Sequence, residues 1–315
     1  MFENLFSMQG LSLDRLKNFL AFADSGSIVA AAGNDHVRQS LYSRQIRELG
    51  EFFGVELVKR QGKGLALTEA GRRLAGIARE QFGSLADFAR EAKGLPATVS
   101  IVTANSLATW LLMPRLMEIR RRLPHHRLIL QHDQTRPMIQ GVLEGKYDIG
   151  LVREKTLLRT LGRKSLGRVG FALFIPKKLA DRMVKDDPTG WLRLPLALPV
   201  GGTLRGEVDR LAEKNGIELN VVVACESYVQ AAVAMESGAV ASILPSIAAR
   251  TLARPGIEVR AMPELVLGNL ETLMIWSKRV AATRKSVRDA VEGLGEILSS
   301  ESHLTPKSSW MGYSR

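Results

Sequence analysis

The stretch LDRLKNFLAFADSGSIVAAAGNDHVRQSLYSRQIRELGEFFGVELVKRQGKGLALTEAG, residues 13–71, decides the fold that we expect for this chain. Three helical patterns follow one another, each separated from the next by a short turn. A short basic hairpin with glycines at its tip comes next, and then the start of a long helix. Three helices and a hairpin in this order predict a winged helix-turn-helix, in which one helix enters the major groove of DNA.

The first two helices have clear boundaries in the sequence. Ser12 is placed to cap the first helix and Gly26 to end it, while Ser27 is placed to cap the second. A serine at the N-cap accepts a backbone hydrogen bond, and glycine readily adopts the left-handed conformation that ends a helix. The second helix, expected over residues 28–32, is rich in alanine and can pack closely.

The third helix, expected over residues 38–52, has two different faces. Its predicted core side is the apolar repeat Tyr42, Ile46, Leu49 and Phe53. The other side is polar and cationic, which suits DNA because arginine reads guanine or phosphate and glutamine reads adenine. Most polar helix faces are merely solvated, so the prediction depends on the helix lying between a tight turn and a basic hairpin. The predicted DNA-reading residues are Arg38, Gln39, Ser40, Ser43, Arg44 and Arg47.

The hairpin is expected to have strands near residues 56–59 and 65–67, joined by glycines. Its tip carries Lys59, Arg60 and Lys63. Positive charge at such a tip suits a phosphate or the minor groove. The plainer interpretation is a solvated hairpin; the neighbouring helix favours a DNA contact.

A long helix is expected from Thr68, its N-cap, to about residue 94. Its apolar stripe is longer than a small domain can cover, so a partner chain's equivalent helix is the natural cover. Packing on this chain's own C-terminal half is the alternative. The predicted dimerisation residues are Leu74, Ile77, Leu85 and Phe88.

Composition places the chain among globular proteins that work in a reducing compartment. The 315 residues carry a formal net charge of +12, but residues 1–95 hold 13 Lys and Arg against 11 Asp and Glu, so about +10 lies in the rest. That excess is either a basic surface without a partner or a sign of an anionic ligand. The single cysteine, Cys225, lies in an apolar run that favours a buried thiol over a sensor, and we expect a cytoplasmic protein. We find no secretion signal and no apolar run of about 20 residues, so no membrane partner is expected.

After a break at residues 94–96, short β-branched runs alternate with helical runs. This alternation predicts a mostly parallel sheet covered by helices, and helices are expected over 107–121, 138–144, 204–214 and 228–236. Ligands of such sheets lie beyond the carboxyl ends of the strands, at helix N-termini. The predicted strands cover residues 98–104, 128–133, 148–152, 169–175, 195–200, 219–227, 240–245 and 272–277.

Polar residues at these strand ends are the candidate effector-binding residues: Asn105, Ser106, Thr135, Arg153, Thr203 and Ser227. Helix N-termini and hydroxyls suit a carboxylate or another oxyanion, with Arg153, Arg136 or Arg205 as its counter-charge. Each candidate is open to a second interpretation as a simple helix cap. Residues 201–203 could form a phosphate-binding loop at a helix start, but a turn of this kind more often merely connects a strand to a helix.

The chain resembles the LysR-type transcriptional regulators over about residues 13–298, most strongly over 19–71. The marks that carry the resemblance are Gly26-Ser27, Ala31-Ala32, Gln39, Ser43-Arg44-Gln45-Ile46, Leu49, Gly54, Leu57, Arg60, Leu67-Thr68 and Ala70-Gly71. In the second half LLMPRLMEIRRRLP, LEGKYDIGLV and ESGAVASILP are similar to the family's effector subdomains. The resemblance implies a homodimer or homotetramer that binds double-stranded DNA of dyad symmetry and a small effector.

The resemblance also implies a domain organisation that combines α+β and α/β units. A winged helix-turn-helix leads through a linker helix to a periplasmic-binding-protein-like effector domain of two α/β subdomains, with Asn105, Ser106, Thr203 and Ser227 around one cleft. The expected bounds are 1–67 for the DNA-binding domain, 68–94 for the linker and dimerisation helix, 95–300 for the effector domain and 301–315 for a flexible tail. Within the effector domain, subdomain I takes 98–166 plus 268–298, and subdomain II takes 167–267.

Several residues depart from the family's pattern. Arg38 stands where a capping Ser or Thr is usual, so we expect Asn34 or Asp35 to cap the third helix if the cap is kept. Asp35 replaces an apolar residue, and burying an unpaired carboxylate is costly, so either the turn is rearranged or Asp35 points outward. Val240 replaces a second glycine near the expected effector pocket.

We find no catalytic, metal or cofactor motif. The five histidines do not show metal-ligand spacing with Cys225, and neither a nucleophile elbow nor a phosphate-binding P-loop occurs. We therefore predict a regulator that is not an enzyme and needs no cofactor. Two alternatives remain: an architectural DNA-binding protein whose C-terminal half only oligomerises, and an α/β enzyme with a helical appendage.

Overall fold

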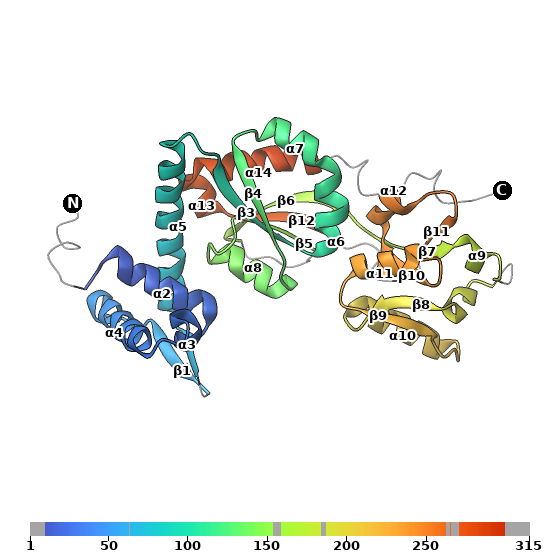
Figure 1. Ribbon diagram of the computed structural model, residues 1–315, viewed down its shortest axis with the longest axis horizontal. Coiled ribbons are helices and arrows are strands. Elements are labelled where there is room, and N and C mark those ends of the chain that lie inside the picture. Colours follow the sequence, from blue (N-terminus) through green and yellow to red (C-terminus); the bar gives the residue numbers. More distant parts are fainter. Residues whose placement is uncertain are drawn as a thin grey trace.

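The computed structural model describes residues 10–62, 64–153, 159–183, 187–262, 265 and 271–299. A small helical domain lies at one end, one long helix joins it to the rest, and two α/β units follow side by side (Figure 1). The predicted fold class is confirmed.

The N-terminal domain packs three helices against a two-stranded hairpin. Ser12 and Ser27 accept backbone hydrogen bonds from Arg15 and Ala30 as N-caps, and Gly26 ends the first helix in the left-handed conformation, as predicted. Phe19, Phe22 and Leu49 are the large side chains at the centre of the core. The elements are α2 (Leu13–Ser25), α3 (Ile28–Ala32), α4 (His36–Phe53), β1 (Val58–Gln61) and β2 (Gly64–Leu67).

The long helix α5 (Glu69–Glu91) begins at Thr68, whose hydroxyl accepts a hydrogen bond from the Gly71 amide. Its first half packs against α2, and its second half lies beside β3 and α13 of the following unit (Figure 1). The helix therefore contacts both the N-terminal domain and subdomain I.

Subdomain I is built on a five-stranded sheet with the order β4-β3-β5-β12-β6. The helix α14 packs on one face of this sheet and α8 on the other, as alternate residues of β3 show: Ile101 belongs to one core cluster and Val102 to another. Its elements are β3 (Ala97–Thr103), α6 (Asn105–Leu107), the π-helix η1 (Ala108–Leu112), η2 (Met113–Arg115), α7 (Leu116–Arg122), β4 (His126–Gln131), α8 (Thr135–Leu143), β5 (Ile149–Arg153), β6 (Leu161–Arg168), β12 (Glu271–Ser277), α13 (Lys278–Thr283) and α14 (Lys285–Leu298).

Subdomain II has a second five-stranded sheet with the order β11-β7-β10-β8-β9. The chain enters it after β6 and returns to subdomain I at β12. Its elements are β7 (Phe171–Pro176), α9 (Lys177–Ala180), η3 (Gly190–Arg193), β8 (Leu196–Pro199), α10 (Thr203–Lys214), β9 (Val221–Cys225), α11 (Tyr228–Glu236), β10 (Ala241–Pro245), η4 (Ser246–Ala248), α12 (Ala249–Leu252) and β11 (Ile257–Ala261).

Three expectations about this half are wrong. The sheets are mixed rather than mostly parallel, because β12 runs antiparallel to β5 and β6, and β7 antiparallel to β10 and β11. The edge strands β6 and β11 were missed because charged side chains interrupt their apolar pattern. The helix expected over 107–121 is broken into α6, η1, η2 and α7, with a proline, Pro114, in η2.

Candidate functional site

The helix that is predicted to read DNA begins with a rearranged turn. α3 ends at Gly33, and both Gly33 and Asn34 adopt positive φ angles of 65° and 63°. Asp35 is then the N-cap, because its carboxylate accepts hydrogen bonds from the amides of Val37 at 2.9 Å and Arg38 at 3.2 Å. Asp35 thus lies outward and supplies the cap that Arg38 cannot, and α4 starts two residues earlier than expected.

The two faces of α4 separate as the sequence predicts, with one exception. Ile46 and Leu49 are buried against α2, and Tyr42 is half-buried. Phe53 is 37% exposed, so its assignment to the core side is wrong. On the other side Gln39 is half-buried, and the remaining predicted DNA-reading residues are exposed: Arg38, Ser40, Ser43, Arg44 and Arg47.

The arginines of this face are held only loosely. Arg44 lies 3.5 Å from Glu48 and Arg47 lies 3.6 Å from Glu51, with the two guanidinium side chains 62% and 71% exposed. Arg38 lies 3.7 Å from Asp35. Exposed ion pairs of this kind contribute little to stability and are screened by salt, so a phosphate can replace the carboxylate at small cost.

The first strand of the wing starts two residues later than expected. Val58 pairs with Leu67 and Gln61 with Gly64, so β1 runs two residues beyond the predicted strand. Lys59 and Arg60 are exposed on it. Lys63, at the tip, lies outside the described residues.

The predicted dimerisation residues on α5 fall into two groups. Leu74 is half-buried and packs against the core of the N-terminal domain. Ile77, Leu85 and Phe88 are 40%, 53% and 70% exposed, so they form an apolar stripe without cover from the described part of this chain.

The described residues contain no helix long and apolar enough to cross a membrane.

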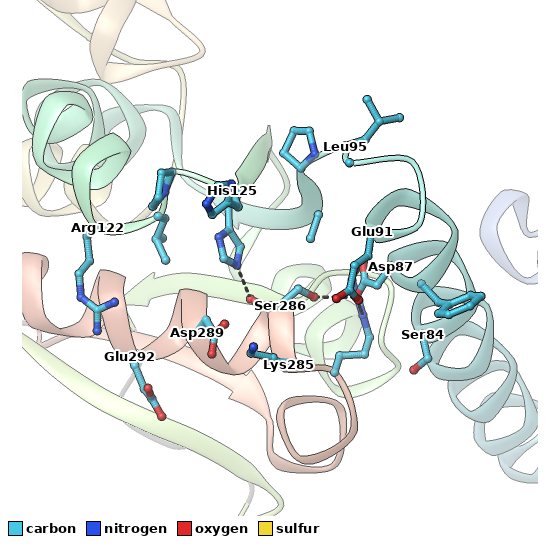
Figure 2. Close-up of a pocket in the computed structure, with 18 of the residues that line it drawn as sticks. Ser84, Asp87, Glu91, Leu95, Arg122, His125, Lys285, Ser286, Asp289 and Glu292 are labelled. Atoms are coloured by element: carbon cyan, nitrogen blue, oxygen red, sulfur yellow. Dashed lines mark hydrogen bonds and ion pairs between the residues drawn. The ribbon is translucent and has the colours of Figure 1, made fainter.

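A groove of about 850 Å³ lies beside the C-terminal half of α5, facing the turn before β4 and the start of α14 (Figure 2). On its floor Arg284 donates to Asp87 at 2.9 Å, and the Ser286 hydroxyl donates to the same carboxylate at 2.6 Å. Burial opposes the charge of Arg284, but its hydrogen bonds with Asp87 and Asp148 outweigh that and raise its pKa. Glu91 adds negative charge to the wall. Phe88 lines this groove, whereas the six candidate effector-binding residues do not.

The candidate effector residues differ in how far they are enclosed, and two of the elements that carry them, α6 and α11, pack against each other. Ser106 follows β3 and is 7% exposed, while its neighbour Asn105 is exposed. The short helix α6 that carries both packs against α11, which begins just after Ser227. Ser227 is half-buried and caps α11 by accepting a hydrogen bond from the Gln230 amide at 3.2 Å.

Arg153 is the most unusual of the candidates. Its Nη2 donates to the Val169 carbonyl at 2.6 Å, its guanidinium lies 5.1 Å from the centre of the Phe171 ring, and its Nε is buried without a hydrogen-bond partner among the described residues. Tyr228 lies against Phe171 with ring centres 5.7 Å apart. Burial lowers the pKa of Arg153 and raises that of Tyr228. Sequence reasoning missed both aromatic residues, whose apolar runs resembled ordinary core.

The remaining candidates are less enclosed. Thr203 begins α10 and is exposed, next to Gly202, which has a φ of 90° and provides no side-chain cap. Thr135 is half-buried at the start of α8. Of the other arginines considered as counter-charges, Arg136 is exposed and Arg205 is paired with Asp209 at 2.8 Å.

One further position bears on the candidate site. Val240, where the family usually has glycine, is buried immediately before β10. Among the described residues no group of three His, Cys, Asp or Glu side chains is placed to hold a metal ion.

Comparison with known proteins places this geometry in a family. A model of the LysR substrate binding domain matches residues 92–296, and a model of the lysR-family bacterial regulatory helix-turn-helix protein matches residues 13–72. The chain therefore belongs to the LysR family of transcriptional regulators. Its relatives include the uncharacterized HTH-type transcriptional regulator YfeR of Shigella flexneri, 25% identical over 277 residues, which cover 85% of this chain and 83% of YfeR.

Two solved structures share the fold. Full-length CbnR complexed with its target DNA has a TM-score of 0.51 and 23% identity, and the match covers 90% of this chain and 100% of that one. Full-length LysG from Corynebacterium glutamicum, with a bound effector arginine, has a TM-score of 0.58 and 21% identity. The match covers 90% of this chain and 99% of LysG.

Proposed function

We propose that this chain reads double-stranded DNA with the exposed face of α4, grips the flanking backbone with its wing, and is controlled by a small anionic effector at the seam between its two subdomains. The observation that carries the DNA-binding part is the outer face of α4, which presents Arg38, Arg44 and Arg47 to solvent at the end of the molecule that lies farthest from subdomain II (Figure 1). Exposed arginines with exchangeable partners suit phosphates and guanine edges.

Selection from a pool of random duplexes tests the DNA-binding part. A two-fold dimer presents two copies of α4, so the enriched duplexes should contain dyad-symmetric half-sites about one or two helical turns apart. Ser43→Asp, which places a negative charge on the outer face, should abolish the enrichment. A pool that shows no enrichment with the unaltered chain would contradict the proposal.

The dimer that we propose forms through the apolar stripe of α5, in an antiparallel arrangement. The first half of the helix carries exposed Arg72 and Arg73, whereas its second half carries exposed Glu91 at the groove of Figure 2, where Asp87 is already paired with Arg284. Antiparallel pairing brings the basic half of one helix against the acidic half of the other, while parallel pairing sets like charges together. It also places Ile77 of one chain near Leu85 of the other.

Sedimentation velocity tests this arrangement. Leu85→Asp and Phe88→Asp should each produce monomers, because a carboxylate would be buried without a partner in the helix pair. Val233→Asp, at a comparably exposed valine on α11, is the control and should leave the dimer intact. Dimers that persist in both α5 variants would overturn the proposed interface.

The effector part of the proposal rests on Arg153. Among the described residues, the half-buried Arg153 has a carbonyl and an aromatic ring as its partners, and an anionic ligand would supply the charge that this arrangement lacks. Tyr228, at the start of α11, reaches the ring that covers Arg153, and α11 with its cap Ser227 packs against α6, which carries Ser106. The ligand class that fits is a small carboxylate or another oxyanion.

Thermal unfolding with a series of small carboxylates, sulfate and phosphate tests the ligand class. A binder should raise the midpoint in proportion to the logarithm of its concentration. Arg153→Met should remove the response while keeping or raising the midpoint of the ligand-free chain, because it removes a poorly compensated buried charge. Arg205→Met, at an arginine already paired with Asp209, is the control. A response that survives Arg153→Met would contradict the assignment.

A further inference from the structure

Arg79, on α5, joins three parts of the molecule. Its Nη2 donates to Asp24 on α2 at 2.7 Å, and its Nη1 donates to the carbonyl of Glu144, the C-cap of α8, at 2.9 Å. The side chain is only 10% exposed, whereas that of Asp24 is 50% exposed. One guanidinium thus connects the N-terminal domain, the linker helix and subdomain I.

The backbone at this junction is shaped for close approach. A Cβ on Gly76 would lie 3.5 Å from the Glu144 carbonyl oxygen and 3.1 Å from the Arg279 guanidinium. Gly145 adopts a φ of 71° and lies over Arg79, where a Cβ would be 3.8 Å from the Cβ of Arg79. The turn after α8 therefore sits directly on α5, with glycine on both sides of the contact.

On the DNA side, the contact of Arg79 leads to the reading helix. Asp24 is near the end of α2, and α2 is tied to α4 by a hydrogen bond from Asn18 to Gln45 at 2.7 Å and by the ion pair of Arg15 with Glu48 at 2.8 Å. A change in the position of α2 should therefore change the position of α4.

On the effector side, Arg79 contacts the end of α8, which packs on β5 and β12 of subdomain I. The helix begins at Thr135, one of the candidate effector residues, and ends next to Arg79. Nine helical residues span about 13 Å and move as a rigid rod. A shift at the start of α8 therefore displaces the Glu144 carbonyl relative to Arg79.

We propose that Arg79 is the positioning residue that transmits the state of subdomain I to the DNA-reading helix. It holds the end of α8 and the end of α2 on one guanidinium, so that movement of either changes the placement of the other. The regulatory consequence rests on the proposed function, but the connection itself does not. By thermodynamic linkage, DNA bound at α4 must alter α8 to the same extent that a ligand acting through α8 alters DNA binding.

Amide hydrogen exchange of the full chain tests this without knowledge of the effector. In the free protein, Arg79→Gln and Asp24→Asn should both speed exchange at the end of α2, and Arg79→Gln should also speed it at the end of α8. Adding a duplex enriched by the unaltered chain should slow exchange in α8 of the unaltered chain, and this response should be lost in Arg79→Gln. Arg121→Gln, at an exposed arginine of α7 in subdomain I, should behave like the unaltered chain in both conditions.

Two results would overturn the proposal. One is free-protein exchange that is unchanged at α2 in both Arg79→Gln and Asp24→Asn; because Asp24 is half-exposed, the second variant is not expected to compromise folding. The other is a DNA-induced change in α8 that persists in Arg79→Gln. Failure of the unaltered chain to bind any duplex would instead refute the proposed function, and the free-protein exchange would still decide whether Arg79 holds the two domains together.

Discussion

The DNA-binding domain and the effector seam hold their arginines in opposite ways. Arg44 and Arg47 are exposed to solvent beside acidic residues that a phosphate can displace, whereas Arg153 lies under an aromatic ring, with a buried Nε that has no partner within the described part of the chain. Exposed cations suit an extended polyanion, because exchanging a carboxylate partner for a phosphate costs them little free energy. Binding of this kind depends on salt. A buried cation suits a small anion that enters a low-dielectric site and brings its own charge.

Two helical glycines, one in each half of the chain, leave different room for a side chain, and substituting them should give the largest change in the free energy of unfolding. A Cβ on Gly71, at the start of α5, would lie 2.0 Å from the Leu57 carbonyl oxygen, a backbone atom held by its hydrogen bond from Thr68. Gly71→Ala should therefore lower the free energy of unfolding of the N-terminal domain by about 3 kcal/mol. Denaturant titration followed by circular dichroism measures the change.

Gly206, in α10 of subdomain II, is the matched control because a Cβ there would meet nothing within 4 Å. Gly206→Ala should raise the free energy of unfolding by about 0.5–1 kcal/mol through helix propensity alone. Equal effects of the two substitutions would show that Leu57 and Gly71 are not packed as described.

The cap of the reading helix should have a smaller effect. Asp35→Ala removes the acceptor for the Val37 and Arg38 amides and should cost about 1 kcal/mol of the free energy of unfolding. Asp35→Asn keeps an acceptor oxygen and should cost only a fraction of that. If alanine and asparagine cost the same, the side chain of Asp35 does not cap α4.

The smallest expected effect concerns the effector half and its one thiol. Cys225 is 4% exposed, and burial raises the pKa of its thiol above the ordinary value. The reactive thiolate is therefore scarce at neutral pH, and reaction with a disulfide reagent should be much slower in the native chain than in the denatured one, and should speed up as pH rises. Native and denatured rates that coincide would show that the thiol is accessible.

The N-terminal domain could be predicted from sequence in detail because its signals are local. Ser12, Ser27 and Thr68 cap the helices that they precede, and the polar face of α4 follows from helical spacing. The start of α4 was misplaced because Asn34 adopts a positive φ and Asp35 takes over the cap, a choice that depends on the whole turn.

The effector half was predictable as strands and helices but not as a site. The arrangement at Arg153 depends on Val169, Phe171 and Tyr228, which meet only when the two subdomains pack. The role of Arg79 likewise depends on Asp24 and on the Glu144 carbonyl, which are 55 and 65 residues away in the chain. No local pattern marks such contacts. The edge strands β6 and β11 were missed because charged side chains interrupt their apolar pattern.

Fluorescence anisotropy of a labelled duplex at several salt concentrations tests the central claim most directly. Arg44→Ala combined with Arg47→Ala should weaken binding and reduce the slope of log affinity against log salt by about 2, because each arginine that contacts a phosphate contributes about 1. Arg182→Ala combined with Arg288→Ala removes the same charge from exposed positions of the effector half and should leave the slope unchanged. If Arg44→Ala combined with Arg47→Ala leaves both the affinity and the salt slope unchanged, the assignment of α4 as the reading helix is wrong.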